Sequence, residues 1–475
     1  MRRNASEGVI RINDKNPHYL EYKGREILLL TSAEHYGAVV NRRFDYKKYL
    51  DALASYTCNY TRIYPGAMVL PLDNFIRRDD TLAPGPDLIA PWARSDAPGY
   101  VGGGNKFDLG RWDGEYFERL ESFIGYAREK DVIVEICFFN CQYPKTYPYC
   151  PLHEDANIQG VGGKDDGAFQ TLSDKSLTGE QLKYIEKIIV ETNKFNNVIY
   201  EFVDEPTLYG AVNADCYNWI DVLIDHAARV EEGLPKKHLF AQQMMYGVDF
   251  SDDGRISINT AQYTEDSGPQ IGGLSALTKA YGRDKPIEMN ETVSLLSEPS
   301  YYERDAVESS RVEAWEFMIG GGAAFNQLNA CFNVKNPSGD HPLNREVMNG
   351  LKNLRTLIEG MDFVRMRCDG GTIREMSVGG RINGISEEGR QYLFYIHHSF
   401  PNLGKWRHTH YLPNFGEYRP VLTVKLPSGS YAAEFIDPAT LAVLSRAELV
   451  TGGDEILIEC PKYKLDLAVK LTAAR

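Results

Sequence analysis

Two short segments of this 475-residue chain end in a carboxylate directly after strand-forming residues. The first ends at Glu205-Pro206, and the second, which begins at Lys285-Pro286, ends at Glu291. A run rich in Val, Ile, Tyr and Phe that stops at a proline favours a β-strand with a defined end. A carboxylate there lies at the rim of a sheet, and two of them supply the proton donor and the nucleophile or base that cleavage of a glycosidic bond requires. Glu205 and Glu291 are therefore the candidate catalytic pair.

Each candidate has a second carboxylate close to it in the sequence. Asp204 directly precedes Glu205, and its charge is expected to raise the pKa of Glu205 toward the value that a general acid needs. Glu288 lies three residues before Glu291, so the alternation of side chains along a strand predicts that it points to the other side. We therefore treat Glu288 as the weaker candidate.

The elements that must position this pair alternate between short apolar strands and amphipathic helices. Eight strands are predicted near residues 27–30, 60–64, 132–139, 198–203, 239–241, 258–263, 286–289 and 323–328. Alternation of this kind implies parallel pairing, and eight units predict an α/β fold, a closed (β/α)8 TIM barrel. The barrel is assigned to residues 1–360, with a short β-hairpin at its start. Few residues separate the fifth and sixth strands, so the helix between them is expected to be short or absent.

After Met361 the helical periodicity gives way to short alternating strands with glycine turns. Examples are residues 392–396, 421–426, 431–436, 455–460 and 465–471. This texture predicts a small all-β sandwich over residues 361–475, following the barrel.

Composition narrows the possible partners. A formal net charge of −14 argues against a nucleic-acid surface, which would be basic, and also against an anionic membrane. No apolar run is long enough to span a bilayer. The first residues carry two arginines without an apolar stretch, so we expect a cytoplasmic protein, although a removed leader would leave the same picture in a secreted one. The sequence does not determine the oligomeric state.

The eight cysteines include no Cys-x-x-Cys pair, so neither a zinc site nor a dense disulfide framework is predicted. Cys141 and Cys150 flank one loop and could pair, but free thiols are the favoured interpretation. No metal and no organic cofactor is expected.

Three segments carry a resemblance to a known group of enzymes. Val-Ile-Tyr-Glu-Phe-Val-Asp-Glu-Pro, at 198–206, resembles the strand-four signature Tyr-Glu-x-x-Asn-Glu-Pro of clan A glycoside hydrolases, the cellulase-like group that includes family 5. The segment 285–291 is similar to the clan's strand seven, which ends in the nucleophile. The segment 59–62 resembles its strand two, and the barrel followed by a β-sandwich is similar to the clan's arrangement.

The resemblance implies a retaining glycosidase that acts on β-linked oligo- or polysaccharides. Glu291 would be the nucleophile and Glu205 the acid/base, with Arg62 and Tyr263 holding Glu291 ionised and oriented. Two departures are visible: Asp204 stands where the clan has Asn, and the Trp expected at strand eight is not evident, where Asn326 lies. Both indicate an altered sugar subsite.

Further candidate contacts for the substrate lie at other strand ends and on loops. His35 and Tyr36 follow the first strand, Asn140 ends the third, and Trp92 lies in the long Pro/Gly-rich connection between 65 and 111, where an exposed aromatic ring would stack on a sugar. The candidate substrate-binding residues are His35, Tyr36, Arg62, Trp92, Asn140, Asp204, Tyr263 and Asn326.

Two alternatives remain open at this point. A non-catalytic carbohydrate-binding barrel, a pseudoenzyme, would keep the fold and the aromatic side chains without turnover. A metal-dependent barrel hydrolase would need clustered histidines at strand ends, of which His35 is the clear example.

Overall fold

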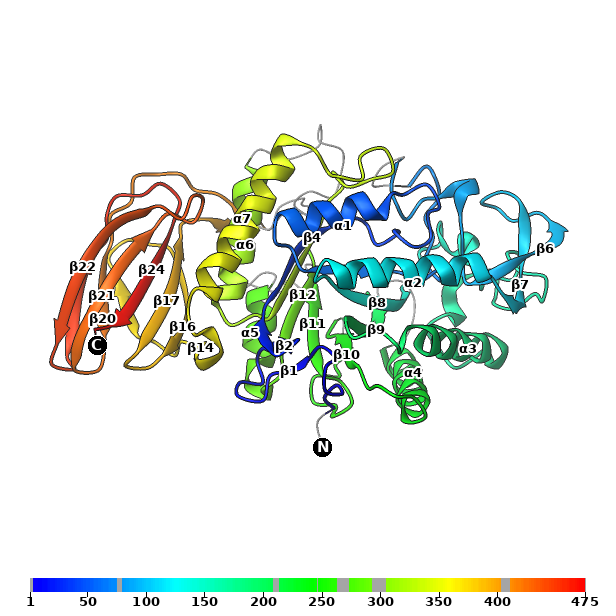
Figure 1. Ribbon diagram of the computed structural model, residues 1–475, viewed down its shortest axis with the longest axis horizontal. Helices are drawn as coiled ribbons and strands as arrows, with labels where there is room; N and C mark the ends of the chain where they lie inside the picture. The colour runs from blue at the N-terminus through cyan, green and yellow to red at the C-terminus, as the bar shows by residue number, and fades with distance from the viewer. Residues whose placement is uncertain are drawn as a thin grey trace.

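A barrel of eight parallel strands forms the larger part of the molecule, as the sequence predicts. The computed structural model (Figure 1) describes residues 3–74, 79–207, 213–245, 247–262, 273–292, 305–402 and 411–474. The barrel strands are β4 (Leu29–Ala33), β5 (Tyr60–Ile63), β8 (Ile133–Asn140), β9 (Val198–Asp204), β10 (Leu239–Gln243), β11 (Ile258–Gln262), β12 (Ile287–Glu291) and β13 (Ala324–Leu328). They pair in the order β4-β13-β12-β11-β10-β9-β8-β5, and every residue of these strands is buried.

The helices surround this sheet and begin where the sequence supplies caps. They are α1 (Tyr46–Ser55), α2 (Gly114–Glu129), α3 (Lys175–Thr192), α4 (Asn213–Glu232), α5 (Gly273–Ala280), α6 (Ala306–Ile319) and α7 (Pro342–Glu359). Asp45, Asp113 and Asp174 each accept a hydrogen bond from a backbone amide of the first turn of α1, α2 and α3. The described residues between β10 and β11 form no α-helix, in agreement with the short connection in the sequence.

β4 and β5 close the ring without a continuous ladder between them. A single residue, Asn59, supplies much of the contact: its amide nitrogen and its side-chain Oδ1 both bond to the backbone of Leu30, at 3.2 and 3.1 Å, and its Nδ2 donates to Leu28 at 2.8 Å. At the other end of the seam Tyr64 N donates to Tyr36 O at 2.9 Å. The side-chain amide thus takes the place of ladder bonds.

The N-terminal residues cover the amino end of the barrel. They form a three-stranded antiparallel sheet, β1 (Arg11–Ile12), β2 (Leu20–Tyr22) and β3 (Arg25–Ile27). Its apolar side chains share a core cluster with residues that begin the barrel strands, including Leu29, Ile133 and Ile258. This end is therefore filled, and the opposite end remains for chemistry.

The long connection after β5 contains a hairpin that the sequence analysis did not predict. β6 (Trp92–Pro98) pairs with β7 (Asn105–Trp112) in antiparallel fashion. The turn between them includes Gly99, Gly103 and Gly104, which adopt φ values of 108°, 100° and 80°. A side chain rarely adopts this region, so the glycines that suggested an irregular loop make the turn.

The C-terminal part consists of two facing antiparallel sheets, as predicted. Their strands are β14 (Arg367–Cys368), β15 (Ile373–Met376), β16 (Arg381–Glu387), β17 (Gln391–His397), β20 (Val421–Lys425), β21 (Gly429–Ile436), β22 (Val443–Thr451), β23 (Glu455–Glu459) and β24 (Asp466–Ala473). The larger sheet has the order β14-β16-β17-β24-β21-β22 and the smaller one β15-β20-β23. A core that includes Phe394, Leu422 and Val469 lies between them.

α6 lies between the barrel and these sheets (Figure 1). It packs on α7 and β13 on one side and on β16, β17 and β19 (Tyr411–Leu412) on the other, so its buried residues surround the helix. β18 (Phe400–Pro401) pairs with β19 beside it. Because the helix is buried all round, its polar residues also have protein partners, as Glu316 does in the β domain.

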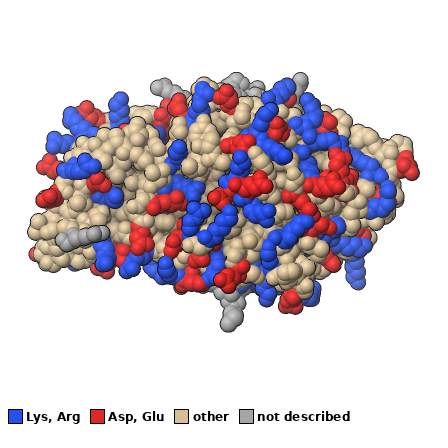
Figure 2. Space-filling view, in the orientation of Figure 1, with Lys and Arg blue, Asp and Glu red and all other residues tan. Residues whose placement is uncertain are grey.

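On the face drawn in Figure 2, basic and acidic side chains are interspersed, and they form no extended patch of one charge. Within the described ranges, no helix combines the length and the apolar character that crossing a membrane requires.

Candidate active site

The two candidate catalytic glutamates lie at the carboxyl ends of two barrel strands. β9 ends at Asp204 and Glu205 follows it, whereas Glu291 is the last residue of β12. Both side chains are buried, with exposed fractions of 4% and 7%. Because the strands are parallel members of one sheet, these ends share an edge. The charge of Glu205 also contributes to raising the pKa of Glu291, so the two carboxyls interact.

The backbone at Glu205 turns sharply out of β9. Its φ of 48° lies in the left-handed region, which residues with a side chain adopt infrequently. The Glu205 amide donates to Oε1 of Gln243, at the end of β10, at 2.7 Å. Strained backbone of this kind persists where surrounding bonds hold it, and it occurs often at active sites. Gln243 therefore fixes the point from which the Glu205 side chain extends.

A β-bulge in β12 sets the direction of Glu291. Ala261 of β11 pairs with Met289, but the next residue, Gln262, pairs with Glu291, so Asn290 is an extra residue. Asn290 donates to the interior carboxyl of Glu201 at 2.8 Å, and Glu291, directly after it, also faces an interior group. A bulge re-aims side chains in this way.

The bulge also corrects the prediction for Glu288. Alternation placed Glu288 and Glu291 on opposite sides of the strand. In the structure Glu288 accepts hydrogen bonds from Tyr60, across the barrel on β5, and from Thr260 at 3.1 Å. Both glutamates thus point inward, Glu288 deep in the barrel and Glu291 at its mouth, because the extra residue resets the alternation.

Arg62 is the cation at the centre of the site. Its fully buried guanidinium contacts Glu201 through Nε at 2.7 Å and Nη2 at 2.5 Å, Asp204 through Nη2 at 2.9 Å, and Glu291 through Nη1 at 3.6 Å. Three carboxylates and one guanidinium leave a net negative cluster, so a proton is easily retained within it.

Asp204 joins residues from four strand ends. Its Oδ1 accepts from Gln243 and forms an ion pair with Arg62 at 2.9 Å, and its Oδ2 accepts from Tyr64 and, at 2.6 Å, from Asn140. These protein contacts hold the carboxylate in place beside Glu205. The contact of Asp204 with a sugar stays a prediction.

The pKa of Glu205 is raised to about 7. Burial is the main cause, and the charge of Asp204 adds to it. The Tyr143 hydroxyl and the Cys141 thiol, the latter at 3.3 Å, both donate to Glu205 Oε2 and partly offset the rise. A carboxyl whose pKa lies near neutrality can hold a proton and release it, as a general acid must.

The pKa of Glu291 is also raised, by burial and by the charges of Asp204 and Glu205. Arg62 and a hydrogen bond from Tyr36 act in the opposite direction. Since the two glutamates interact, they titrate as a pair that retains a proton at neutral pH. Glu291 lies beside a cation, which favours its charged form, whereas the donors to Glu205 from Tyr143 and Cys141 are uncharged.

Tyr36 and Asn326 lie behind Glu291. Tyr36 has a φ of 59°, and its hydroxyl also accepts from Asn326 Nδ2 at 3.2 Å. Asn326 donates in addition to the carbonyl of Asn290 at 2.9 Å, so both residues hold the bulge. Tyr263, predicted for the same support of the nucleophile, lies outside the described residues, as does its loop.

His35 and Asn140 lie on either side of this centre. His35 Nδ1 bonds to the buried carboxylate of Asp80 at 2.8 Å. Burial disfavours the imidazolium, but Asp80 outweighs it and raises the pKa of His35. The His35 side chain keeps 16% of its surface exposed, so it is available to a ligand. Asn140 is buried and donates to Asp204 and to Tyr64.

The prediction of an exposed sugar platform at Trp92 is wrong. The indole is fully buried in β6 and stacks on Tyr184 of α3, with ring centroids 5.1 Å apart. The Pro/Gly-rich sequence around it indicated a loop, whereas the hairpin carries the ring inward against the helices. Trp92 therefore stabilises the packing of the connection after β5.

A second layer of carboxyls lies beneath the site and was not predicted. Glu135, Glu201 and Glu288 are all fully buried, and the Tyr60 hydroxyl lies within hydrogen-bond distance of both Glu135 and Glu288, with one hydrogen to donate. Burial and neighbouring charges raise the pKa of Glu201 to about 7 and that of Glu135 further. Arg62 is the cation that faces this layer, so most of these carboxyls stay protonated.

Sequence reasoning also missed Tyr64, Cys141, Gln243 and Asn290 as parts of the site, and it considered Tyr143 as a sugar contact and not as a donor to Glu205. Each follows or ends a barrel strand, or begins the loop after it, so a polar residue at the end of an apolar strand was the available signal. All eight cysteines are free thiols, as favoured from the sequence. In the described parts of the chain, no group of three or more His, Cys, Asp or Glu is arranged to hold a metal ion.

The fold defined by these elements is a (β/α)8 barrel followed by an all-β domain, and solved glycoside hydrolases share it. A glycoside hydrolase family 5 protein from Bacteroides vulgatus ATCC 8482 superposes with a TM-score of 0.64 at 11% identity, covering 98% of this chain and 94% of that one. A second structure, described as a glycoside hydrolase, gives a TM-score of 0.62 at 11% identity, with coverage of 98% and 97%. No protein-family model and no curated sequence matches the chain. At this identity the likeness establishes the fold alone.

Proposed function

We propose that this protein is a glycosidase that cleaves β-linked oligo- or polysaccharides by a retaining mechanism with two carboxyls. The observation that carries the proposal is the pair of buried strand-end glutamates, one beside Arg62 and one beside neutral donors. The shared fold with glycoside hydrolases supports it. A saccharide is the substrate, and the steps below use no metal and no organic cofactor.

In the first step the Glu291 carboxylate attacks the anomeric carbon. The bond to the leaving oxygen breaks as that oxygen takes the proton of Glu205, and a glycosyl ester of Glu291 forms. In the second step Glu205, now ionised, takes a proton from water, whose oxygen attacks the same carbon and releases Glu291. Two inversions return the original configuration.

The neighbouring groups divide their work between these steps. Arg62 and Tyr36 stabilise the ionised Glu291 before attack. Asp204 keeps the proton on Glu205 until the leaving oxygen is near, because its charge disfavours a second one. Tyr143 and Cys141 occupy Glu205 Oε2, so the proton that is transferred sits on Oε1.

We also propose that residues 361–475 form a separate folding unit that acts as a scaffold for the barrel. Glu316 of α6 supports this, since it bonds Arg381 at 2.8 Å and His397 at 3.1 Å in the β domain. Arg311 of the same helix pairs with Asp466 at 2.9 Å. These buried contacts tie the wall of the barrel to the β-sheets.

The test is turnover of aryl β-glycosides and of a glycan panel by the wild type, by Glu291→Ala and by Glu205→Ala. We expect Glu291→Ala to lose activity, and azide with an activated substrate to restore it as a glycosyl azide of inverted configuration. Glu205→Ala should retain activity only toward substrates with good leaving groups, and with azide it should yield a glycosyl azide of retained configuration. Glu118→Ala, on the exposed face of α2, is the control.

Two outcomes would contradict the proposal. Full activity in Glu291→Ala would exclude it as the nucleophile. A wild type that binds a glycan tightly without turning over any substrate would favour a carbohydrate-binding barrel instead.

A further inference from the structure

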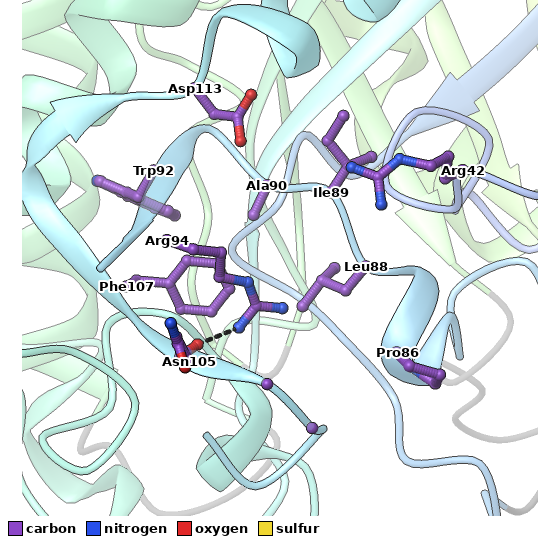
Figure 3. Close-up of a pocket in the computed structure, with 12 residues that line it drawn as sticks. Arg42, Pro86, Leu88, Ile89, Ala90, Trp92, Arg94, Asn105, Phe107 and Asp113 are labelled. Carbon is purple, nitrogen blue, oxygen red and sulfur yellow. Dashed lines mark hydrogen bonds between the residues drawn. The ribbon is translucent and has the colours of Figure 1, made fainter. Parts of the chain in front are cut away.

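A cavity of about 420 Å³ lies between Asp113, which caps α2, and residues of the β6–β7 hairpin such as Arg94 and Phe107 (Figure 3). Its lining comes from the loop after β4 and the connection after β5, both of which leave carboxyl ends of barrel strands. It shares none of these lining residues with the contacts of Glu205 and Glu291. The volume falls within the range of about 300–1,000 Å³ that small-molecule sites occupy.

The floor of this cavity is apolar and its rim is open. Leu88, Ile89, Ala90 and Phe107 are buried beneath it, whereas Pro86 at the rim is exposed. An apolar floor under an open rim can pack against one face of a ligand ring, and the edges of that ring then remain free to contact polar side chains of the wall.

Arg94 is a fixed donor in the wall. Its guanidinium lies 4.0 Å from the ring centroid of Phe107 and 4.6 Å from that of Tyr100, and Nη1 donates to the carbonyl of Asn105 at 2.7 Å. No carboxylate of the described chain lies within ion-pair distance of it. The remaining N–H groups are therefore held in place without an anionic partner.

Asp113 provides an acceptor on another side of the same hollow (Figure 3). One of its oxygens, Oδ1, accepts from Tyr116 N at 3.1 Å and so caps α2, which leaves Oδ2 for a ligand. Arg42 at the rim is already paired with Glu115 through two bonds of 2.8 and 2.9 Å. The cavity thus combines one available cation with one available anion.

This combination selects the chemistry of the ligand. The charge of Asp113 would repel a carboxylate or a phosphate, and the charge of Arg94 would repel a cation. An apolar molecule would leave both charges unpaired. A saccharide ring meets every requirement: its hydroxyl oxygens accept from Arg94, its hydroxyl hydrogens donate to Asp113, and its C–H face packs on Leu88 and Ile89.

We propose that this cavity is a distal saccharide-binding subsite, which holds units of the glycan away from the bond that is cleaved. The inference rests on the proposed function only in taking a saccharide as the substrate. Binding energy from such a site lowers KM for long chains and does little for a substrate too short to reach it.

The binding test uses Glu291→Ala, which prevents turnover, and neutral β-1,4-linked gluco-, manno- and xylohexaose in calorimetry. Adding Arg94→Gln or Asp113→Asn should weaken hexaose binding about tenfold or more, the value of a hydrogen bond to a charged group. Asn still caps a helix, so Asp113→Asn keeps α2 intact. Arg43→Gln, on the neighbouring loop and outside the cavity, should leave binding unchanged.

In the otherwise wild-type enzyme, Arg94→Gln should raise KM for the hexaose that is cleaved relative to KM for its aryl glycoside. Equal hexaose affinity with and without Arg94→Gln would overturn the inference, as would binding of none of the hexaoses or of a sugar acid alone. An absence of turnover in the wild type would instead overturn the proposed function and leave the binding result to be read on its own.

Discussion

Two fully buried glutamates of this chain have opposite acid strengths. Glu205 at the barrel mouth has a pKa of about 7, whereas Glu316, between the barrel and the β domain, has a pKa of about 2. Burial raises the pKa in both places and is the largest cause in each. The difference therefore comes from the partners.

Glu316 is surrounded by donors that favour its charge. Arg381 supplies a positive charge at 2.8 Å, His397 Nε2 lies 3.1 Å from the same oxygen, and the Tyr411 hydroxyl donates to the second oxygen. Glu205 instead has uncharged donors, from Tyr143, Cys141 and Gln262, next to the anion Asp204. Burial alone therefore does not decide whether the pKa of a glutamate is raised or lowered. The presence or absence of a cation beside the buried carboxyl decides it.

The same contrast gives the two glutamates opposite effects on stability. The pKa of Glu316 is lowered on folding, so its contribution is present above the unfolded value near 4.5 and is lost as the pH falls toward 2. The pKa of Glu205 is raised on folding, so stability is unaffected below 4.5 and decreases as the pH rises through 7. At neutral pH Glu205 therefore destabilises the fold, whereas Glu316, between the barrel and the β domain, stabilises it.

The largest effect should come from removing the cation of the active site. Arg62→Gln leaves Glu201, Asp204 and Glu291 without their partner, and loss of one side of a buried ion pair costs about 3–5 kcal/mol. Urea unfolding should show a greater loss at pH 8 than at pH 5, because the raised pKa values of Glu201 and Glu291 leave these two carboxyls less charged at the lower pH. Equal losses at both pH values would contradict the electrostatic explanation. Arg128→Gln, on the exposed face of α2, is the control.

Glu316→Gln should destabilise the protein by about 3 kcal/mol at pH 7, from a fall in pKa from 4.5 to about 2 at 1.36 kcal/mol per unit. The difference from wild type should shrink as the pH falls below 4.5. Denaturant titrations at pH 3, 5 and 7 measure it. A difference that is constant with pH would mean that packing, and not charge, governs this contact.

Glu205→Gln should have the opposite sign. Above pH 7 we expect the variant to be more stable than the wild type by about 1–2 kcal/mol, and equal to it at pH 4. Glu291 also ionises more readily once Glu205 cannot, so relief of its raised pKa adds to the gain. Thermal unfolding at both pH values provides the comparison, and a destabilised variant at pH 8 would show that the charge of Glu205 is compensated.

Tyr143→Phe should have the smallest effect. Loss of a donor to Oε2 disfavours the carboxylate, so the pKa of Glu205 rises and the basic limb of the kcat/KM profile moves to higher pH. A net hydrogen bond of about 0.5–1.5 kcal/mol corresponds to a shift of roughly one pKa unit or less. Tyr149→Phe, in the same loop, should leave the profile in place. A shift to lower pH would reverse the assigned role of Tyr143.

The sequence predicted the barrel because its strands are buried on both faces and read as continuous apolar runs. Its helices are buried on one face and show apolar residues at three- and four-residue spacing, so the two kinds of element can be told apart. It also predicted the positions of Glu205 and Glu291, since a charge at the end of an apolar strand is visible in one dimension. The bulge at Asn290 was not predictable, because it depends on register with β11. The contacts of Asp204 were not predictable either, because they come from the ends of four strands that are far apart in the sequence.

Trp92 and α6 show the other limit. The glycines near Trp92 suit an irregular loop and a hairpin turn equally, and only the packing on Tyr184 distinguishes them. α6 is buried on all sides, including polar residues such as Glu316, because a second domain covers it, and the local sequence of the helix does not predict that contact.

The seam between β4 and β5 makes this barrel a split ring. Tyr36 and Arg62, which both act on Glu291, stand on opposite sides of the split, with the guanidinium 4.8 Å from the tyrosine ring centroid. The side chain of Asn59 bridges the split at its base, and one backbone bond, from Tyr64 N to Tyr36 O, bridges it at the mouth. The surroundings of Glu291 are therefore assembled from two strands that side-chain and single backbone bonds, and not a ladder, hold together.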